Sequence, residues 1–232
     1  ERKSKLASEA HAHGHGETLA LREQFDTAYQ QRDASTLGMW IFLITEVMFF
    51  GGMFAAYTIY RSAYPTVFAI ASSSLNVKIG AINTCVLLLS SFTMVMAVRA
   101  GQLGQRKLII FFLILTLFFG CIFLGVKGYE WTEKYEEHHM PGQVAFHLDG
   151  TDLQGPAKLF FSLYFAMTGL HALHMVVGVG ILTFLILETR KGKYSAEYYT
   201  PVDISGLYWH FVDVVWIFLF PLLYLIDRHL PK

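Results

Sequence analysis

Five long apolar segments constrain this chain more than any other feature of its sequence. A membrane-spanning helix needs about 20 mainly apolar residues. The chain is 54% hydrophobic and only 16% charged, which favours burial of most of its length in lipid. The segments cover roughly residues 37–60, 78–98, 108–126, 157–188 and 204–226. We therefore predict an all-α integral membrane protein, a bundle of five transmembrane helices.

The residues before the first segment differ from the rest of the chain. The sequence HAHGHG at residues 11–16 is a His-rich tract, which we interpret as a solvated tail rather than a metal site. Residues 18–32 carry apolar side chains at helical spacing, which predicts a short amphipathic helix at the membrane surface. We therefore divide the chain into a polar N-terminal part, residues 1–36, and a five-helix transmembrane domain, residues 37–232.

The basic residues predict the orientation of the bundle. The larger share of the 18 lysines and arginines lies on the side of the N-terminus, including clusters near Arg99, Arg106 and Arg190. Short basic loops stay on the cytoplasmic side. We expect a cytoplasmic N-terminus and, after five spans, an outside C-terminus. Residues 128–156 then form an acidic outer loop, which we interpret as solvated, with electrostatic attraction of a basic protein as the alternative.

Small and polar residues inside the segments predict where helices meet. Gly51 and Gly52 belong to a small-residue face of the kind that lets a neighbouring helix approach closely. The second segment contains hydroxyl and amide side chains suited to hydrogen bonds between helices, namely Asn83, Thr84, Ser90 and Ser91.

Five ionisable residues stand well inside the predicted spans and form the candidate site. They are Glu46, His171, His174, His210 and Asp213. Such groups are costly in lipid, so they usually face a protein interior and serve a function or a contact. Three interpretations remain open: a haem or metal site, a proton or solute path, and a polar network that fixes helix packing.

The packing network is the interpretation that we favour, and within it we expect Glu46 to lie within hydrogen-bond reach of a side chain of the fourth or fifth span, with His174 as the first candidate. At about 1.5 Å per residue, His174 and His210 lie at different depths in the membrane, which disfavours a shared haem. The five residues include no pair of nucleophile and base, so we expect no catalytic step by this chain alone. Its formal net charge is +0, and no basic cluster suggests a nucleic acid. A stand-alone transporter that uses Glu46, His174 and Asp213 is the alternative.

Four stretches of sequence together resemble one known family. They are MWIFLITEVMFFGG from Met39, INTCVLLLSS from Ile82, MTGLHALHMVVGVG from Met167 and YWHFVDVVWIFLF from Tyr208. The chain resembles the cytochrome c oxidase subunit III family of the haem-copper terminal oxidases, in its shorter, five-helix bacterial type. Near the end of the third segment, Lys127 stands where the family more often has glutamine.

This resemblance implies a function that the residues alone do not reach. It implies a non-catalytic subunit of a proton-pumping oxidase in aerobic respiration, embedded in the bacterial cytoplasmic (inner) membrane. It implies subunits I and II as partners, with haem and copper in those partners, and structural phospholipid bound to this chain. Cytochrome c or quinol is the expected electron donor of the complex. Within the family's wider relations, an accessory subunit of a nitric oxide reductase is the alternative.

Overall fold

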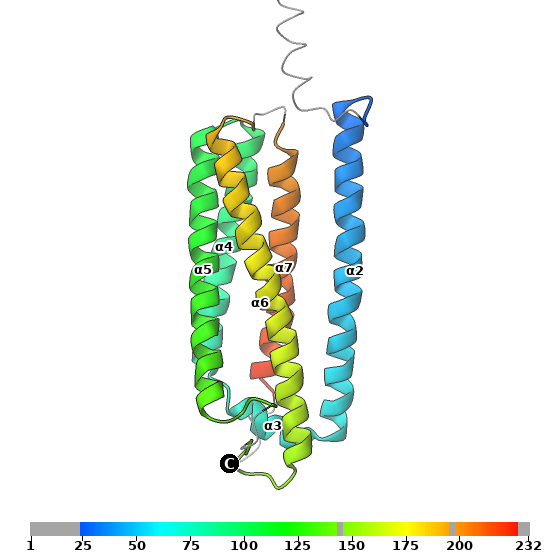
Figure 1. Ribbon diagram of the computed structural model, residues 1–232, viewed down its shortest axis with the longest axis vertical. Coiled ribbons are helices and arrows are strands. Elements are labelled where there is room, and N and C mark those ends of the chain that lie inside the picture. The colour runs from blue at the N-terminus through cyan, green and yellow to red at the C-terminus, as the bar shows by residue number, and fades with distance from the viewer. Residues whose placement is uncertain (1–23, 143–145, 195–197, 227–232) are drawn as a thin grey trace, which may run out of the picture. The chain divides into compact units, whose positions relative to one another are not determined.

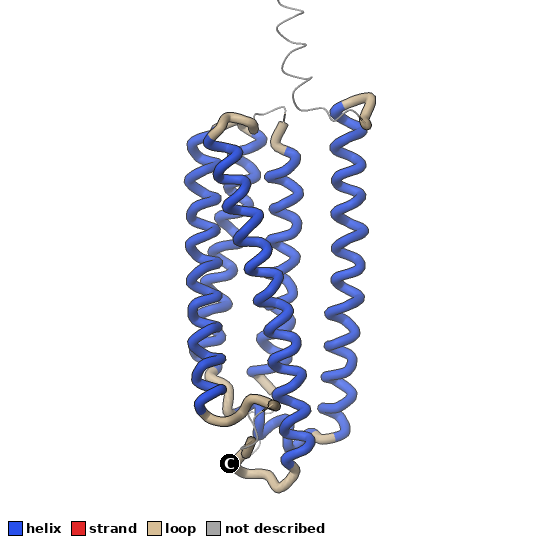
Figure 2. Tube along the Cα trace, in the orientation of Figure 1, coloured by secondary structure: helices blue, strands red, loops and turns tan. Residues whose placement is uncertain are grey.

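The structure is a computed structural model that describes residues 24–142, 146–194 and 198–226 (Figure 1). The predicted His-rich tract therefore lies outside the described residues. The described part is all-helical (Figure 2). Its helices are α2 (Ala28–Ala63), α3 (Pro65–Ser73), α4 (Val77–Gln102), α5 (Arg106–Glu136), α6 (Gln154–Arg190) and α7 (Thr200–Tyr224). The chain divides into two compact units, one ending at Ile44 and the other beginning at Thr45.

Five helices are long and apolar enough to span a membrane, as the sequence predicts. They are α2, α4, α5, α6 and α7, and their mean hydropathy over 18 residues lies between 1.6 and 2.9. The short α3 is the helix that the hydropathy pattern did not predict. Its first residue, Pro65, suits the first turn of a helix because proline lacks only an N–H group that would have no partner there.

Helix α2 begins earlier than predicted. The hydropathy pattern predicts that the first span begins near residue 37, but α2 already begins at Ala28 and passes through the predicted boundary at residue 36. The hydroxyl of Ser35 donates a hydrogen bond to the carbonyl of Gln31, one turn earlier, instead of capping a new helix. Of the predicted surface helix, residues 24–27 are described and are not helical, whereas residues 28–32 belong to α2 and are continuous with the first span.

Within the second unit, the last four long helices form a ring. Helix α4 packs against α5 and α7, and α6 packs against the same two neighbours. The large side chains of Trp209, Trp216, Phe123 and Tyr164 are buried at the centre of this bundle. Helix α3 packs on α6 and α7 near one end of the ring.

Glycines allow one tryptophan to fill the bundle. A Cβ atom added at Gly120 of α5 or at Gly178 of α6 would lie 2.8 Å from the ring of Trp209 on α7. Only glycine at both positions leaves room for this indole. By contrast, no atom of the described residues lies within 4 Å of a Cβ added at Gly51 or Gly52, so the close helix contact at this small-residue face stays a prediction.

Candidate functional site

Glu46 and His174 form the contact that the sequence predicts between the first and fourth spans. In the second unit, Glu46 Oε2 lies 3.2 Å from Nε2 of His174, and the two side chains are 20% and 16% exposed. The Phe50 ring, one turn along α2, lies 5.5 Å from the imidazole of His174. The pair therefore sits beside an aromatic side chain and joins α2 to α6.

The geometry of His174 fixes where its protons lie. Its Nδ1 is 2.8 Å from the carbonyl oxygen of Leu170, one turn earlier on α6. A carbonyl oxygen only accepts, so Nδ1 carries a hydrogen. The other ring nitrogen, Nε2, faces the carboxyl of Glu46 at 3.2 Å. The pair is thus a close polar contact between two helices.

The other three predicted residues do not join this pair in one hydrogen-bonded network. His210 bonds instead to α4, where the hydroxyl of Ser91 lies 2.8 Å from its Nδ1. The sequence named Ser91 as a candidate for a hydrogen bond between helices and His210 as a polar residue of the span, but it did not pair the two. This contact joins α4 to α7 at a half-buried position.

His171 and Asp213 are buried but make no hydrogen bond within the described ranges. Both ring nitrogens of His171 and both carboxyl oxygens of Asp213 lack a hydrogen-bond partner there, although Ser91 neighbours Asp213. The His171 ring packs on Trp216, with centroids 5.1 Å apart, and on Phe123, at 5.4 Å. In the described part of the molecule, His171 therefore contributes through ring packing.

The predicted hydrogen-bonding residues of α4 do bind neighbouring helices. Asn83 donates to the carbonyl of Phe123, and Ser90 donates to the carbonyl of Thr116, both on α5. The indole N–H of Trp216 donates to the hydroxyl of Thr84 at 3.0 Å. Side chains of this kind hold membrane helices together, since lipid offers their polar atoms no partner.

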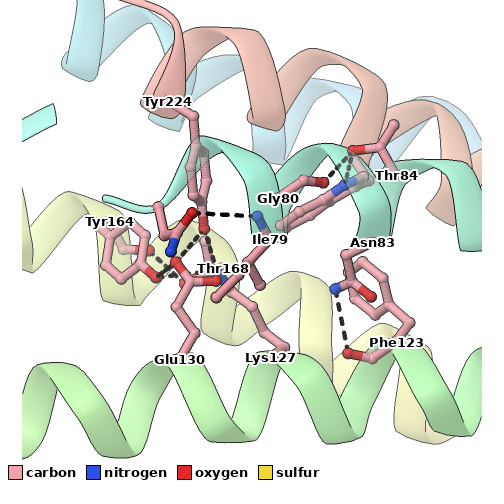
Figure 3. A network of polar contacts seen from close by, with 12 residues as sticks. Ile79, Gly80, Asn83, Thr84, Phe123, Lys127, Glu130, Tyr164, Thr168 and Tyr224 are labelled. Atoms are coloured by element: carbon pink, nitrogen blue, oxygen red, sulfur yellow. Dashed lines mark hydrogen bonds and ion pairs between the residues drawn. The ribbon is translucent and has the colours of Figure 1, made fainter. Parts of the chain in front are cut away.

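A second polar cluster, which the sequence did not predict, joins three helices (Figure 3). We call Lys127, Glu130, Tyr164 and Tyr224 the Lys127 cluster. The ammonium of Lys127 donates to Glu130 at 3.1 Å, to the hydroxyl of Tyr164 at 3.0 Å and to that of Tyr224 at 2.7 Å. Both tyrosine hydroxyls in turn donate to the other oxygen of Glu130.

Aromatic rings complete the surroundings of Lys127. Its Nζ lies 4.8 Å from the ring centre of Tyr164, 5.2 Å from that of Trp216 and 5.3 Å from that of Tyr224. Aromatic faces attract a cation, most strongly where water is excluded, and Lys127 is only 2% exposed. The cluster therefore holds a buried ion pair with every ammonium proton used.

The hydropathy pattern does not predict the Lys127 cluster, because it predicts that the third span ends near residue 126. That boundary puts Lys127 at the membrane surface and Glu130 in the acidic outer loop. Instead, α5 continues to Glu136 and buries both side chains. The spacing of the two charges, three residues apart in GVKGYEW, was the signal available, because residues at that spacing share a helix face.

The polar groups of the described site connect helices to one another. Among residues 24–142, 146–194 and 198–226, no three His, Cys, Asp or Glu side chains converge in a way that would hold a metal ion. What the described site offers is one glutamate–histidine contact, one serine–histidine bond and one buried ion pair. The first two link different helices, and the ion pair of α5 is linked to α6 and α7 through Tyr164 and Tyr224.

Known proteins resemble this chain over most of its length. A family model described as cytochrome c oxidase subunit III matches residues 23–227. The cytochrome c oxidase subunit 3 of Thermostichus vulcanus is 32% identical and covers 88% of this chain and 92% of its own. The quinol oxidase subunit 3 of Bacillus subtilis is also 32% identical, over 82% and 85% of the two chains. The chain therefore belongs to the cytochrome c oxidase subunit III family.

Proposed function

We propose that this chain is the accessory third subunit of a haem-copper terminal oxidase and takes no direct part in its chemistry. The observation that carries the proposal is the family match over residues 23–227, on a chain with five helices able to span a membrane. The reduction of dioxygen and the pumping of protons then belong to the complex. The haem and copper centres lie in partner subunits I and II.

The finer parts of the proposal concern placement and partners. The basic loops favour a cytoplasmic N-terminus and an outside C-terminus in a bacterial cytoplasmic membrane. The exposed apolar side chains of the spans give phospholipid a surface to bind. Relatives named as cytochrome c oxidase and as quinol oxidase subunits both match this chain at 32% identity, so either donor fits the complex.

Within this function, we assign Glu46 and His174 the role of holding α2 against α6. Two polar side chains in contact at bilayer depth resist separation because lipid offers neither of them another polar partner. Chemistry at the distant oxygen-reducing centre does not depend on this contact directly.

Glu46→Leu tests this assignment in the purified native assembly. We expect initial oxidase turnover close to that of the wild type, and about three- to tenfold weaker retention of this chain in detergent. Glu46→Gln should weaken this retention less, because its amide can donate a hydrogen bond to Nε2 of His174. A variant at an exposed position on the same helix, Ile59→Leu, serves as the control. Immediate loss of all turnover in Glu46→Gln would contradict an accessory role.

One preparation separates the main proposal from its rivals. The complex purified through this chain in mild detergent should contain a haem protein and consume oxygen. Consumption of nitric oxide instead would indicate an accessory subunit of a nitric oxide reductase. Solute or proton uptake by this chain reconstituted alone would indicate a transporter built on Glu46, His174 and Asp213.

A further inference from the structure

A polar group lies at the surface of the bundle where α4 and α7 meet. The hydroxyl of Ser91 bonds to Nδ1 of His210, and both side chains are half-buried. The other ring nitrogen of His210, Nε2, makes no hydrogen bond within the part of the chain that the structure describes. His210 lies six residues after residue 204, where the predicted fifth span begins. At 1.5 Å per residue this is roughly 9 Å into the span, within the hydrocarbon.

Apolar side chains flank this polar group on both helices. Leu88 and Val95 stand three residues before and four after Ser91, and they are 50% and 46% exposed. Val214 and Ile217 follow His210 by four and seven residues, and they are 46% and 43% exposed. Residues at these spacings share a helix face. We call this surface the α4/α7 face.

The α4/α7 face is distinct from the side of the bundle that α2 contacts in the second unit. There, Phe50 of α2 lies 6.3 Å from Phe211 of α7, and Tyr57 lies 6.2 Å from Phe160 of α6. Phe211 follows His210 directly, and successive residues of a helix point about 100° apart. His210 therefore turns toward α4 while its neighbour turns toward α2.

Lipid cannot complete the hydrogen bonds of His210. The acyl chains at that depth offer neither a donor nor an acceptor, and an unsatisfied polar atom in hydrocarbon is costly. Polar side chains on membrane helices usually meet a polar group of another helix. We infer that the α4/α7 face is the docking surface for a membrane-spanning helix of the haem-binding subunit. That helix presents a hydrogen-bonding group to His210 at the same depth.

This inference rests on the proposed function for the identity of the partner, and it adds the face and the residues that meet it. Apolar exposure alone does not single out a face. On α5, Ile114 and Phe118 are 42% and 56% exposed and form a similar apolar stripe. What distinguishes the α4/α7 face is a polar ring nitrogen at its centre that needs a partner.

Photo-crosslinking in native membranes tests the face directly. A benzophenone amino acid is placed at Leu88 or Val214, and at Phe118 as the matched control on another face. After irradiation, the complex is purified through this chain and adducts are identified by mass spectrometry. We expect adducts with the haem-binding subunit from positions 88 and 214 and none from 118.

Other adduct patterns would overturn the inference. Adducts from 118 but not from 88 or 214 would place the partner on another face. Adducts with a second copy of this chain, or lipid adducts alone, would also refute it. If no haem protein co-purifies at all, the proposed function itself fails. If a haem protein co-purifies but 88 and 214 give no adduct with it, only the docking face is wrong.

A substitution at the centre of the face gives a second, independent measurement. We expect His210→Phe to weaken retention of the haem-binding subunit about three- to tenfold, the range of a single hydrogen bond between membrane helices. The thermal stability of this chain in detergent is measured in parallel, because Ser91 also loses its partner. Weakened retention without a matching loss of stability supports docking. Unchanged retention contradicts it.

Discussion

Two buried polar regions of the same bundle satisfy their hydrogen bonds to very different extents. In the Lys127 cluster, all three ammonium protons of Lys127 and both oxygens of Glu130 have partners. Around His171, the described structure places rings and no hydrogen bond. Burial is nearly the same, since Lys127 is 2% exposed and His171 is 1% exposed. Burial alone therefore does not show which polar residue holds the bundle together by hydrogen bonds.

The difference follows from charge. A buried ion pair must recover the free energy of hydration that both ions lose, so it needs a complete set of partners at short distance. An imidazole that packs among aromatic rings loses less hydration and can be retained mainly for its shape. Any substitution within the Lys127 cluster should accordingly lower the stability of the bundle, whereas few substitutions of His171 should do so.

The largest loss of stability is expected for Lys127→Met. It removes the cation and leaves Glu130 buried without its charge partner, which typically costs about 3–5 kcal/mol. The measurement is chemical unfolding in detergent, followed by tryptophan fluorescence. The double variant Lys127→Met with Glu130→Leu should recover part of the loss, since it removes both charges. Equal stability of wild type and Lys127→Met would show that the ion pair contributes nothing.

A smaller effect is expected for Tyr224→Phe. The variant removes a hydroxyl that accepts from Lys127 and donates to Glu130, at a cost of about 1–3 kcal/mol for the buried groups left without a partner. Tyr129→Phe on α5 is the matched control, because its side chain is 65% exposed. If Tyr224→Phe and Tyr129→Phe have the same stability in this assay, the hydroxyl of Tyr224 does not stabilise the cluster.

His171→Phe should change stability by no more than about 1 kcal/mol, because it keeps the ring between Phe123 and Trp216. The same unfolding assay measures it. A loss as large as that of Tyr224→Phe would break the comparison, since it would show that the ring nitrogens of His171 have hydrogen-bond partners of their own.

The smallest effect concerns the pH dependence of stability at His139. His139 stacks on Phe161 with ring centres 5.0 Å apart, and it lies in the loop after α5. Burial, and next the charge of Lys134, lower the pKa of His139 below its usual 6.5, despite the nearby Glu137. The unfolded chain then takes up a proton at higher pH than the folded chain. The stability that His139 contributes is present above pH 6.5 and is lost as pH falls from there toward the lower folded pKa.

Unfolding midpoints at about pH 8 and pH 5.5 measure this effect. His139→Gln should reduce the drop in stability on acidification. His147→Gln is the matched control, because the His147 side chain is 68% exposed. A drop that is the same in wild type and His139→Gln would assign the pH dependence to other groups.

The pattern of apolar residues predicted the main helices because lipid imposes a length and a composition on each span. The sequence also predicted the contact of Glu46 with His174 and the helix-joining role of Asn83, Thr84, Ser90 and Ser91. These predictions succeeded because a polar side chain at bilayer depth has few partners to choose from. The family follows from four motifs, and the match over residues 23–227 confirms it.

The sequence by itself therefore determined an all-helical bundle with five spans, its family and the pairing of Glu46. Only the tertiary structure decided where the charges of GVKGYEW lie. Glu130 meets Tyr164 and Tyr224, which are 34 and 94 residues away in the chain. Hydropathy counts lysine and glutamate as the end of a span because it cannot include such distant partners. Once folding brings those hydroxyls and rings together, the ion pair lies in the interior and α5 continues past it.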